Sequence, residues 1–435
     1  MATGMSVGGL VSGLDTAGLI SQLMQAEAAP QQALRNKVTK EQSVISAYQA
    51  ISLKFATMKT QGDVIAKSET WQTQSVTSSS TKVSASATTA ATSGSITFEV
   101  DALAAAHAVM AKSIDSLDTV VVTDPAAGIQ IGGKTVALTD GSLKDVVAKV
   151  NADKTLGVTA ATVLASDGKY VLQLSATKTG AASVFTVTGL SAATQTLSQG
   201  TDALITVGTG TNTYSVSSAT NTFTGVLPGV TFTVSEQSAT QVTLTSQRDD
   251  KAIADKMQAL VDAINAGSAE IDKNTATGAK TKAGVLAGDY ATRILDSRIA
   301  DGINTPLAGS GNTLATIGIE LDRDGKVTFN RDKFLTALGT DAAGTQDAAT
   351  ELATRFADLG NSVSEPLKGS LVLAVARHDE TVTDLNKQID DWDTRLELRK
   401  QSLERQFTAM ETALGRLRDQ SSWLSGQLGS LPSNG

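Results

Sequence analysis

The stretch VTDLNKQIDDWDTRLELRKQSLERQFTAMETALGRLRDQSSWLSGQL, residues 382–428, decides how this chain folds. An apolar row runs through it with one member every seven residues: Val382, Ile389, Leu396, Leu403, Met410, Leu417 and Leu424. A second row lies three or four residues after members of the first and consists of Leu385, Trp392, Phe407, Leu414 and Leu428. This spacing predicts a long helix with one covered side, in a coiled coil or bundle. At about 1.5 Å per residue the row is on the order of 60 Å long, so we expect a projecting leg.

The amino-terminal part of the chain carries a matching helical pattern. Asp15 is a candidate N-cap, and an apolar face made of Leu19, Ile20, Leu23 and Met24 follows it. Pro30 is expected to end or kink this helix and to be the first residue of the next. A second apolar stripe then runs from Leu34 to Met58, interrupted by Glu41. We therefore expect the two ends of the chain to pair.

The middle of the chain has the alternating pattern of strands. A Ser/Thr/Ala-rich stretch leads into ITFEV, and further alternation follows in IQIGGKTVAL, LASDGKYVLQLS and GVTFTVSEQSATQVTLTS. The piece SLKDVVAKVN predicts one short helix among these strands, and helical spacing resumes at DDKAIADKMQALVDAINAGSAEI. The order helix, strands, small α/β unit, strands, helices indicates domains inserted one inside another.

The expected fold is α+β and multidomain, with long terminal helices, a helical domain and nested β-rich head domains. The expected ranges are 1–41 with 391–435 for a terminal coiled-coil leg, 42–71 with 248–390 for a helix-rich domain, 72–117 with 195–247 for a β-rich head domain, and 118–194 for an inserted α/β module.

Composition excludes several classes of protein. A net charge of −8 and 4% aromatic residues argue against nucleic-acid binding. The chain has no Cys, which excludes disulfides, thiolate metal sites and cysteine nucleophiles. No segment approaches the roughly 18 consecutive apolar residues of a membrane span. The first Lys or Arg is Arg35, so we expect no general secretory signal and, if the protein is exported, another export route.

No constellation of reactive residues is visible, so we expect no enzyme, no metal site and no cofactor. The two histidines, His107 and His378, are far apart; His107 is expected on a strand and His378 in a surface or capping role. IELDRDGKVTFN lacks the spacing of a calcium loop, and Asp324-Gly325 fits a hairpin turn. Asp390, Asp391 and Asp393 are expected on the solvated face of the long helix.

The terminal apolar stripes are the remaining candidate for function. They could simply pair within one chain, but the carboxy-terminal row is longer and more regular than its amino-terminal counterpart. The excess apolar surface predicts contacts with other subunits. The candidate interface residues are Leu14, Ile20, Leu23, Met24, Leu403, Phe407, Met410, Leu414, Leu417, Trp423, Leu424 and Leu428.

The chain resembles the bacterial flagellar filament cap proteins, the flagellar hook-associated protein 2 family. The similarity lies in the opening VGGLVSGLDTAGLISQLMQAEAAP, in the module beginning GIQIGGKTVAL, which is similar to one shared by flagellin-related proteins, in GVLAGDYATRILDSRI, in IGIELDRDGKVTFNRDKFLTAL and in the ending LERQFTAMETALGRLRDQSSWLSGQL. It extends in order over nearly the whole chain, and the two ends are its most specific parts.

The resemblance implies a homo-oligomeric cap at the distal tip of the flagellum that promotes flagellin folding and insertion and prevents loss of exported flagellin. It also implies flagellin, a dedicated export chaperone and hook–filament junction proteins as partners, and export through the flagellar type III apparatus. Nucleic acid and membrane insertion are not expected. Two alternatives stay open: another axial component of the hook–filament junction type, or a tip-displayed adhesin whose exposed surface would be the middle of the chain.

Overall fold

The structure is a computed structural model that describes residues 13–278, 283–308 and 313–429. The chain divides into two compact units. Unit 1 consists of Met1–Ala66 with Asp255–Gly435, and unit 2 is the intervening segment Lys67–Ala254. One unit is therefore inserted into the other along the sequence.

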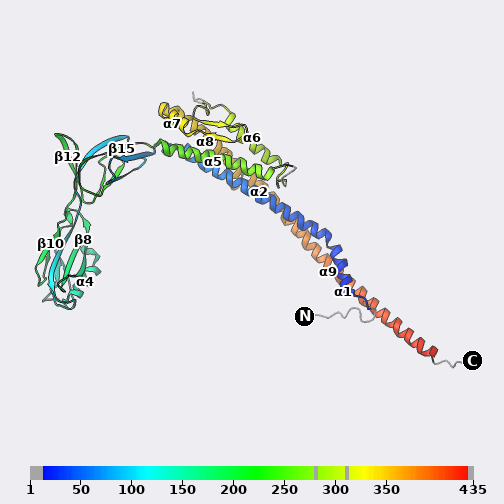
Figure 1. The fold of residues 1–435 in the computed structure, drawn as a ribbon. Helices are drawn as coiled ribbons and strands as arrows, with labels where there is room; N and C mark the ends of the chain where they lie inside the picture. Colours follow the sequence, from blue (N-terminus) through cyan, green and yellow to red (C-terminus); the bar gives the residue numbers. More distant parts are fainter. Residues whose placement is uncertain (1–12, 279–282, 309–312, 430–435) are drawn as a thin grey trace, which may run out of the picture. The chain divides into compact units, whose positions relative to one another are not determined.

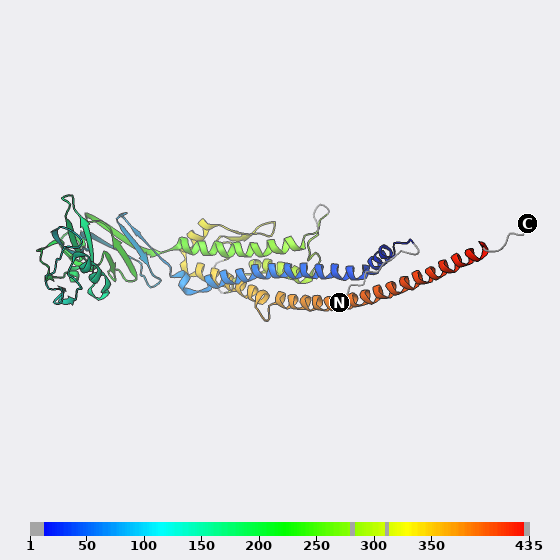
Figure 2. The same ribbon diagram turned by 90° about the horizontal axis from the view of Figure 1, so that it is seen from below.

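Unit 1 is built mainly from long helices (Figure 1). Its elements are α1 (Thr16–Glu27), α2 (Ala29–Ala66), most of α5 (Asp250–Thr275), α6 (Tyr290–Asn304), β16 (Ile319–Leu321), β17 (Val327–Phe329), α7 (Arg331–Thr340), α8 (Ala342–Ser364) and α9 (Ser370–Gly429). The two views in Figures 1 and 2 agree that α2 and α9 run side by side. The long carboxy-terminal helix expected from the seven-residue row is confirmed, and it spans 60 residues.

The start of α1 follows the expected capping rule. The side chain of Asp15 accepts a hydrogen bond of 2.8 Å from the backbone N–H of Gly18, which satisfies one of the donors left open in the first helical turn. Helix α1 ends at Glu27 and α2 begins at Ala29. Pro30 is thus the second residue of α2, not the first as expected. A proline is tolerated there because the first turn has no intrahelical partner for its N–H.

The core of unit 1 lies where α2 meets α8. Ile51, Phe55 and Met58 are fully buried on the inner face of α2. The two helices approach so closely that a methyl group on Gly360 of α8 would lie 2.5 Å from the carbonyl oxygen of Phe55. A methyl group on Gly62 of α2 would likewise lie 2.5 Å from the carbonyl oxygen of Ala353. Glycine at both crossing points is therefore needed for this packing.

Unit 2 opens with the short helix α3 (Ser68–Trp71) and contains a β-sandwich. One sheet has the order β1-β15-β3-β11-β12 and the other β13-β14-β2. The strands are β1 (Gln74–Ser78), β2 (Val83–Ala87), β3 (Gly94–Ala102), β11 (Ala203–Thr209), β12 (Asn212–Ser218), β13 (Thr222–Thr224), β14 (Val230–Val234) and β15 (Ser238–Arg248). The two sheets enclose a core in which the rings of Phe98 and Phe223 each stack on Phe232. Alternating buried side chains along the strands produce this core.

The chain between β3 and β11 forms a second β-rich part of unit 2. Its sheets have the orders β10-β4-β8-β7 and β6-β5-β9. The elements are β4 (Ala106–Ile114), β5 (Ile129–Ile131), β6 (Lys134–Val136), α4 (Leu143–Ala152), β7 (Val158–Leu164), β8 (Tyr170–Thr179), β9 (Val187–Thr188) and β10 (Thr194–Ser198). Leu143, Val146 and Val150 of α4 are buried in the core of this part. The amphipathic helix and the hairpin around Gly168 are both confirmed.

The α+β, multidomain fold class is confirmed. The four domain ranges expected from the sequence stay a prediction. Two pairings bear on where their boundaries lie: β4, expected in the outer head domain, pairs with β8, expected in the inserted module, and with β10, which spans the expected boundary after residue 194.

Candidate functional site

The first half of α9 is covered by the amino-terminal helices of the same chain. Helix α9 packs against α2 and then against α1, so the two ends of the chain meet as expected. Leu385, Ile389 and Leu403 of α9 are buried, and the exposed fraction of Leu403 is 7%. This part of the apolar row therefore has its partner within the chain.

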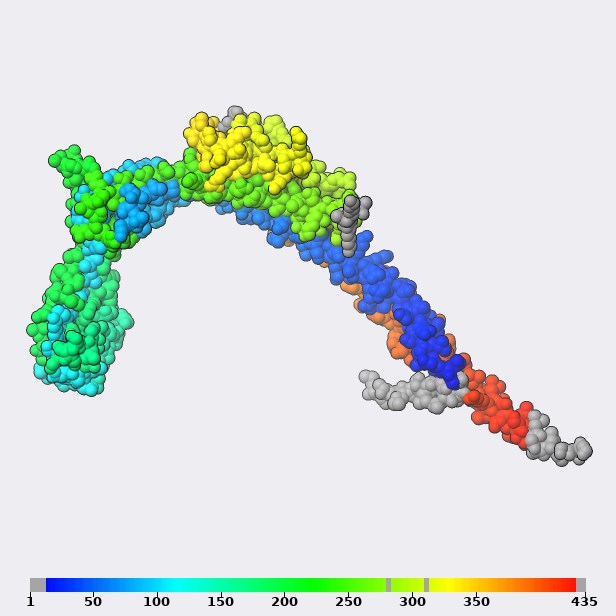
Figure 3. Space-filling view, viewed as in Figure 1, coloured from blue at the N-terminus to red at the C-terminus, as the bar shows by residue number. Residues whose placement is uncertain are grey.

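The last turns of α9 are different. Beyond Leu403 the exposed fraction rises to 36% at Met410, 60% at Leu417, 66% at Trp423 and 55% at Leu424. Figure 3 shows the red end of α9 continuing past the blue α1. The seven-residue pattern continues while the covering helix does not. Met410, Leu417, Trp423 and Leu424 therefore form an apolar surface that the described part of the chain does not cover. We call this surface the open row.

Hydrogen bonds link α1 and α2 to the part of α9 that precedes the open row. The amide nitrogen of Gln31 donates to Oδ1 of Asp393 at 2.6 Å and to the carbonyl oxygen of Ile389 at 3.3 Å. Nε of Arg399 donates to Oε1 of Glu27 at 2.8 Å. Asp393, expected on the solvated face of α9, therefore also takes part in a contact between helices. Because Gln31 is buried, its amide needs these acceptors.

A second polar cluster lies near the start of α9. Nδ1 of His378 lies 2.5 Å from Oε2 of Glu41, and the His378 ring lies against the ring of Tyr48. The Tyr48 hydroxyl donates to Oδ1 of Asp289 at 2.9 Å. Burial, with the hydrogen bond to Asp289 and its negative charge, raises the pKa of Tyr48 to about 12. The expected surface or capping role of His378 is wrong, since the side chain joins α9 to α2. Glu41 interrupts the stripe of α2 because it faces this histidine.

The other candidate interface residues differ in exposure and lie in two groups, one at each end of the chain. On the amino-terminal side, Leu14 and Leu23 are exposed, while Ile20 and Met24 are half-buried. Phe407 and Leu414 of α9 are half-buried, and the side chain of Leu428 lies outside the described residues. Ile20, Leu23 and Met24 lie on α1, which contacts α9, and Leu14 lies just before α1. That these residues contact other molecules stays a prediction.

The polar contacts of α1 and α2 with α9 were not predicted from the sequence. One signal for Gln31 was present: it stands seven and fourteen residues before Val38 and Ile45, so it is a polar residue in an apolar row. Nothing local marked Tyr48 and Asp289 as partners, because 241 residues separate them.

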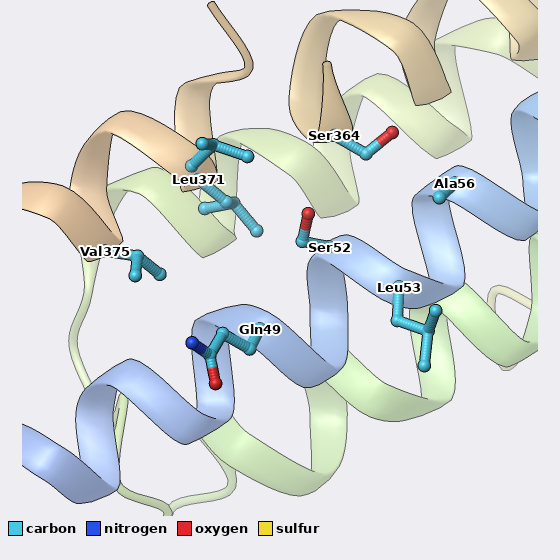
Figure 4. Close-up of a pocket in the computed structure, with 8 residues that line it drawn as sticks. Gln49, Ser52, Leu53, Ala56, Ser364, Leu371 and Val375 are labelled. Carbon is cyan, nitrogen blue, oxygen red and sulfur yellow. The ribbon is translucent and has the colours of Figure 1, made fainter. Parts of the chain in front are cut away.

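A shallow groove is also present in unit 1, between α2, the end of α8 and the start of α9 (Figure 4). Its lining includes Gln49, Ser52, Leu53, Ala56, Ser364, Leu371 and Val375. This lining carries no ionisable side chain, so the groove offers no general acid or base.

The residues that could have carried chemistry have structural roles. His107 is buried on β4, where Nδ1 accepts a hydrogen bond from the Gly200 N–H at 3.4 Å. Asp322 accepts from the N–H groups of Asp324 and Lys326 in the expected hairpin between β16 and β17. Among the described residues, no group of three or more acidic or histidine side chains could hold a metal ion. No helix within the described ranges is long and apolar enough to cross a membrane.

Comparison with known proteins identifies the relatives of this chain. Residues 200–419 match the family model "Flagellar hook-associated protein 2 C-terminus", and residues 12–107 match "Flagellar hook-associated protein 2 N-terminus". The lateral flagellar hook-associated protein 2 of Vibrio parahaemolyticus is 28% identical over 369 residues, covering 77% of this chain and 81% of the relative. Flagellar hook-associated protein 2 of Escherichia coli K12 is 25% identical over 479 residues, covering 96% and 97%.

A solved structure has a similar fold. The crystal structure of the D1-D2-D3 domains of the flagellar cap protein FliD from Escherichia coli aligns with a TM-score of 0.59 and 23% sequence identity. The alignment covers 76% of this chain and 99% of that structure. The carboxy-terminal family model alone spans half of the chain and includes α9 as far as residue 419. The chain therefore belongs to the flagellar hook-associated protein 2 family.

Proposed function

We propose that this protein caps the distal end of a bacterial flagellar filament as a homo-oligomer and assembles through the open row of α9. The observation that carries the proposal is the change along one helix from a covered row at Leu403 to an exposed row from Met410 onward. The family and the E. coli relative, whose structure is described as a flagellar cap protein, support the location.

The open row has the chemistry of a helix-binding surface. Leu417, Trp423 and Leu424 are all more than half exposed. Removing such side chains from water is favourable by about 25 cal/mol for each Å² of apolar area. The seven-residue spacing matches the geometry by which one helix inserts side chains between those of another. Helices of sister subunits or of flagellin would satisfy both requirements, and the half-exposed face of α1 would extend the surface.

The proposed action is templating, without the making or breaking of covalent bonds. Subunits joined through their helix ends would hold the distal end of the filament, retain exported flagellin there and present one vacant position at a time. Binding and folding of flagellin would supply the free energy. The proposal includes no enzymatic activity, no nucleotide and no cofactor.

The proposed location is outside the cell, at the distal tip of the flagellum. Export through the flagellar type III apparatus, a dedicated export chaperone and contact with hook–filament junction proteins are part of the proposal. Their support is the membership of this family.

The test is electron microscopy of filaments from the source organism, labelled with a gold-tagged antibody against this protein. Label confined to the distal ends is the expected result. Label at the hook junction or along the filament would assign the protein to another part of the axial structure and overturn the proposal. Filaments from a strain lacking the protein provide the control for antibody specificity.

A further inference from the structure

We propose that Met410 is an oxidation site that weakens assembly when peroxide-class oxidants convert its thioether to a sulfoxide. The inference deepens the proposed function and rests on it, since it assigns a chemical control to the open row. It concerns the one methionine of the seven-residue row, which stands where the covered part of α9 ends.

Met410 is the most exposed methionine among the residues that the structure describes. The sequence contains seven methionines and no cysteine, so no thiol competes for the oxidant. Met58 and Met257 are fully buried, Met24 and Met110 are half-buried, and Met410 is 36% exposed. Met1 and Met5 lie outside the described residues. A soluble oxidant reacts fastest with sulfur that it can reach, so Met410 should react before the other methionines of the folded core.

The chemical step is a two-electron oxygen transfer. Hydrogen peroxide passes one oxygen atom to the thioether sulfur, a sulfur–oxygen bond forms, the peroxide oxygen–oxygen bond breaks, and water leaves. Sulfur is oxidised and peroxide is reduced, and no further reductant is needed. The product is a polar, chiral side chain in place of a flexible apolar one.

The position of Met410 determines the consequence. It stands seven residues after Leu403, which the chain itself covers, and seven before Leu417, which is exposed. Within the isolated chain Met410 is 36% exposed, so its sulfoxide oxygen can reach water at a smaller cost than in a closed interface. In an assembled helix interface that oxygen would lose water without gaining an assured donor, which is costly. Oxidation should therefore weaken assembly far more than it weakens folding.

The experiment treats the full-length chain with graded hydrogen peroxide. Peptide mass mapping gives the oxidised fraction of each methionine, and sedimentation velocity gives the concentration of half-assembly. We expect Met410 to react before Met58 and Met257, and half-assembly to require about tenfold more protein once Met410 is oxidised. Subsequent treatment with methionine sulfoxide reductases A and B should restore assembly, which would assign the effect to methionine and not to Trp423.

Two matched variants complete the test. Met410→Leu should lose the response to peroxide, and Met110→Leu, in unit 2, should keep it. Each variant is compared before and after treatment, so that any effect of the substitution itself cancels. Two outcomes would overturn the inference: Met410 remains reduced while Met58 and Met257 react, or its complete oxidation leaves half-assembly unchanged. If Leu417→Ala also leaves assembly unchanged, the proposed surface fails; if Leu417→Ala weakens assembly and oxidation does not, only the oxidation site fails.

Discussion

Replacing Leu403 and Leu417 separately by alanine should separate folding from assembly. The two leucines occupy the same seven-residue row of α9, fourteen positions apart. Leu403 is covered by the chain itself, while Leu417 belongs to the open row. We therefore predict that Leu403→Ala destabilises the single chain and that Leu417→Ala chiefly weakens its association.

The structure sets the size of each effect. Leu403 is 7% exposed, so Leu403→Ala loses nearly all the burial of its side chain and should lower the free energy of unfolding of the helix pair by about 2 to 3 kcal/mol. Leu417 is 60% exposed, so less than half of its side chain is covered in the isolated chain. Leu417→Ala should therefore cost below about 1 kcal/mol in the isolated chain. In an interface that covers the row, the same change should cost about 2 kcal/mol for each contact.

The assay combines two measurements on both variants. Urea unfolding, followed by far-ultraviolet circular dichroism at a concentration where the protein is monomeric, gives the stability of the chain. Sedimentation velocity across a concentration series gives the midpoint of assembly. The reasoning is refuted if Leu417→Ala destabilises the monomer as much as Leu403→Ala, because the end of α9 would then be packed within its own chain. It is also refuted if Leu417→Ala assembles at the unchanged midpoint.

Three further predictions concern the rest of the molecule. Gly360→Ala should lower the unfolding free energy by about 1 to 3 kcal/mol in urea titrations, because its methyl group would collide with α2. The control Gly339→Ala, on α7 with open space around it, should be neutral or stabilising. Equal effects of the two variants would contradict the close helix crossing. The pKa of Tyr48 is raised to about 12, so the folded state favours the neutral hydroxyl. Its contribution to the free energy of unfolding should be fully present below about pH 10 and lost as the pH rises through about 12. The difference in stability between the unmodified protein and Tyr48→Phe should therefore shrink over that window. Removing residues 1–35 and 415–435 should leave a folded middle yet abolish capping; normal filament growth with the truncated protein would show that the terminal helices are not the working part.

The fold was predictable wherever local spacing determines structure. The seven-residue row required a long helix, and Asp-Gly pairs marked the hairpins around Gly168 and Gly325. Register and strand order could not be predicted, because they depend on contacts between distant residues. The pairing of β1 with β15, for example, joins residues about 170 positions apart in the chain. The position of Pro30 was wrong by one residue, which is the usual uncertainty at a helix end.

The sequence predicted that α9 has an apolar side in need of a partner, but not which part of that side the chain itself covers. The row on α9 showed that one side of the helix must be covered. It could not show where coverage by the chain itself ends, because that point depends on how α1 and α2 lie along α9. Gln31 and Glu27 contact Asp393 and Arg399, more than 350 residues away in the sequence. The place of Gln31 in an apolar row indicates a covered position, but nothing local to Gln31 or Glu27 identifies its partner.

The fluorescence of Trp423 reports whether the open row leaves water when the protein assembles. Trp423 is 66% exposed in the single chain, and subtracting the spectrum of a Trp423→Phe variant isolates its emission from that of the other two tryptophans. We predict emission typical of a hydrated indole at low concentration, with a shift to shorter wavelength as sedimentation detects assembly. Emission that stays unshifted while oligomers form would mean that the open row remains in water, and would contradict the claim that α9 assembles through its uncovered end.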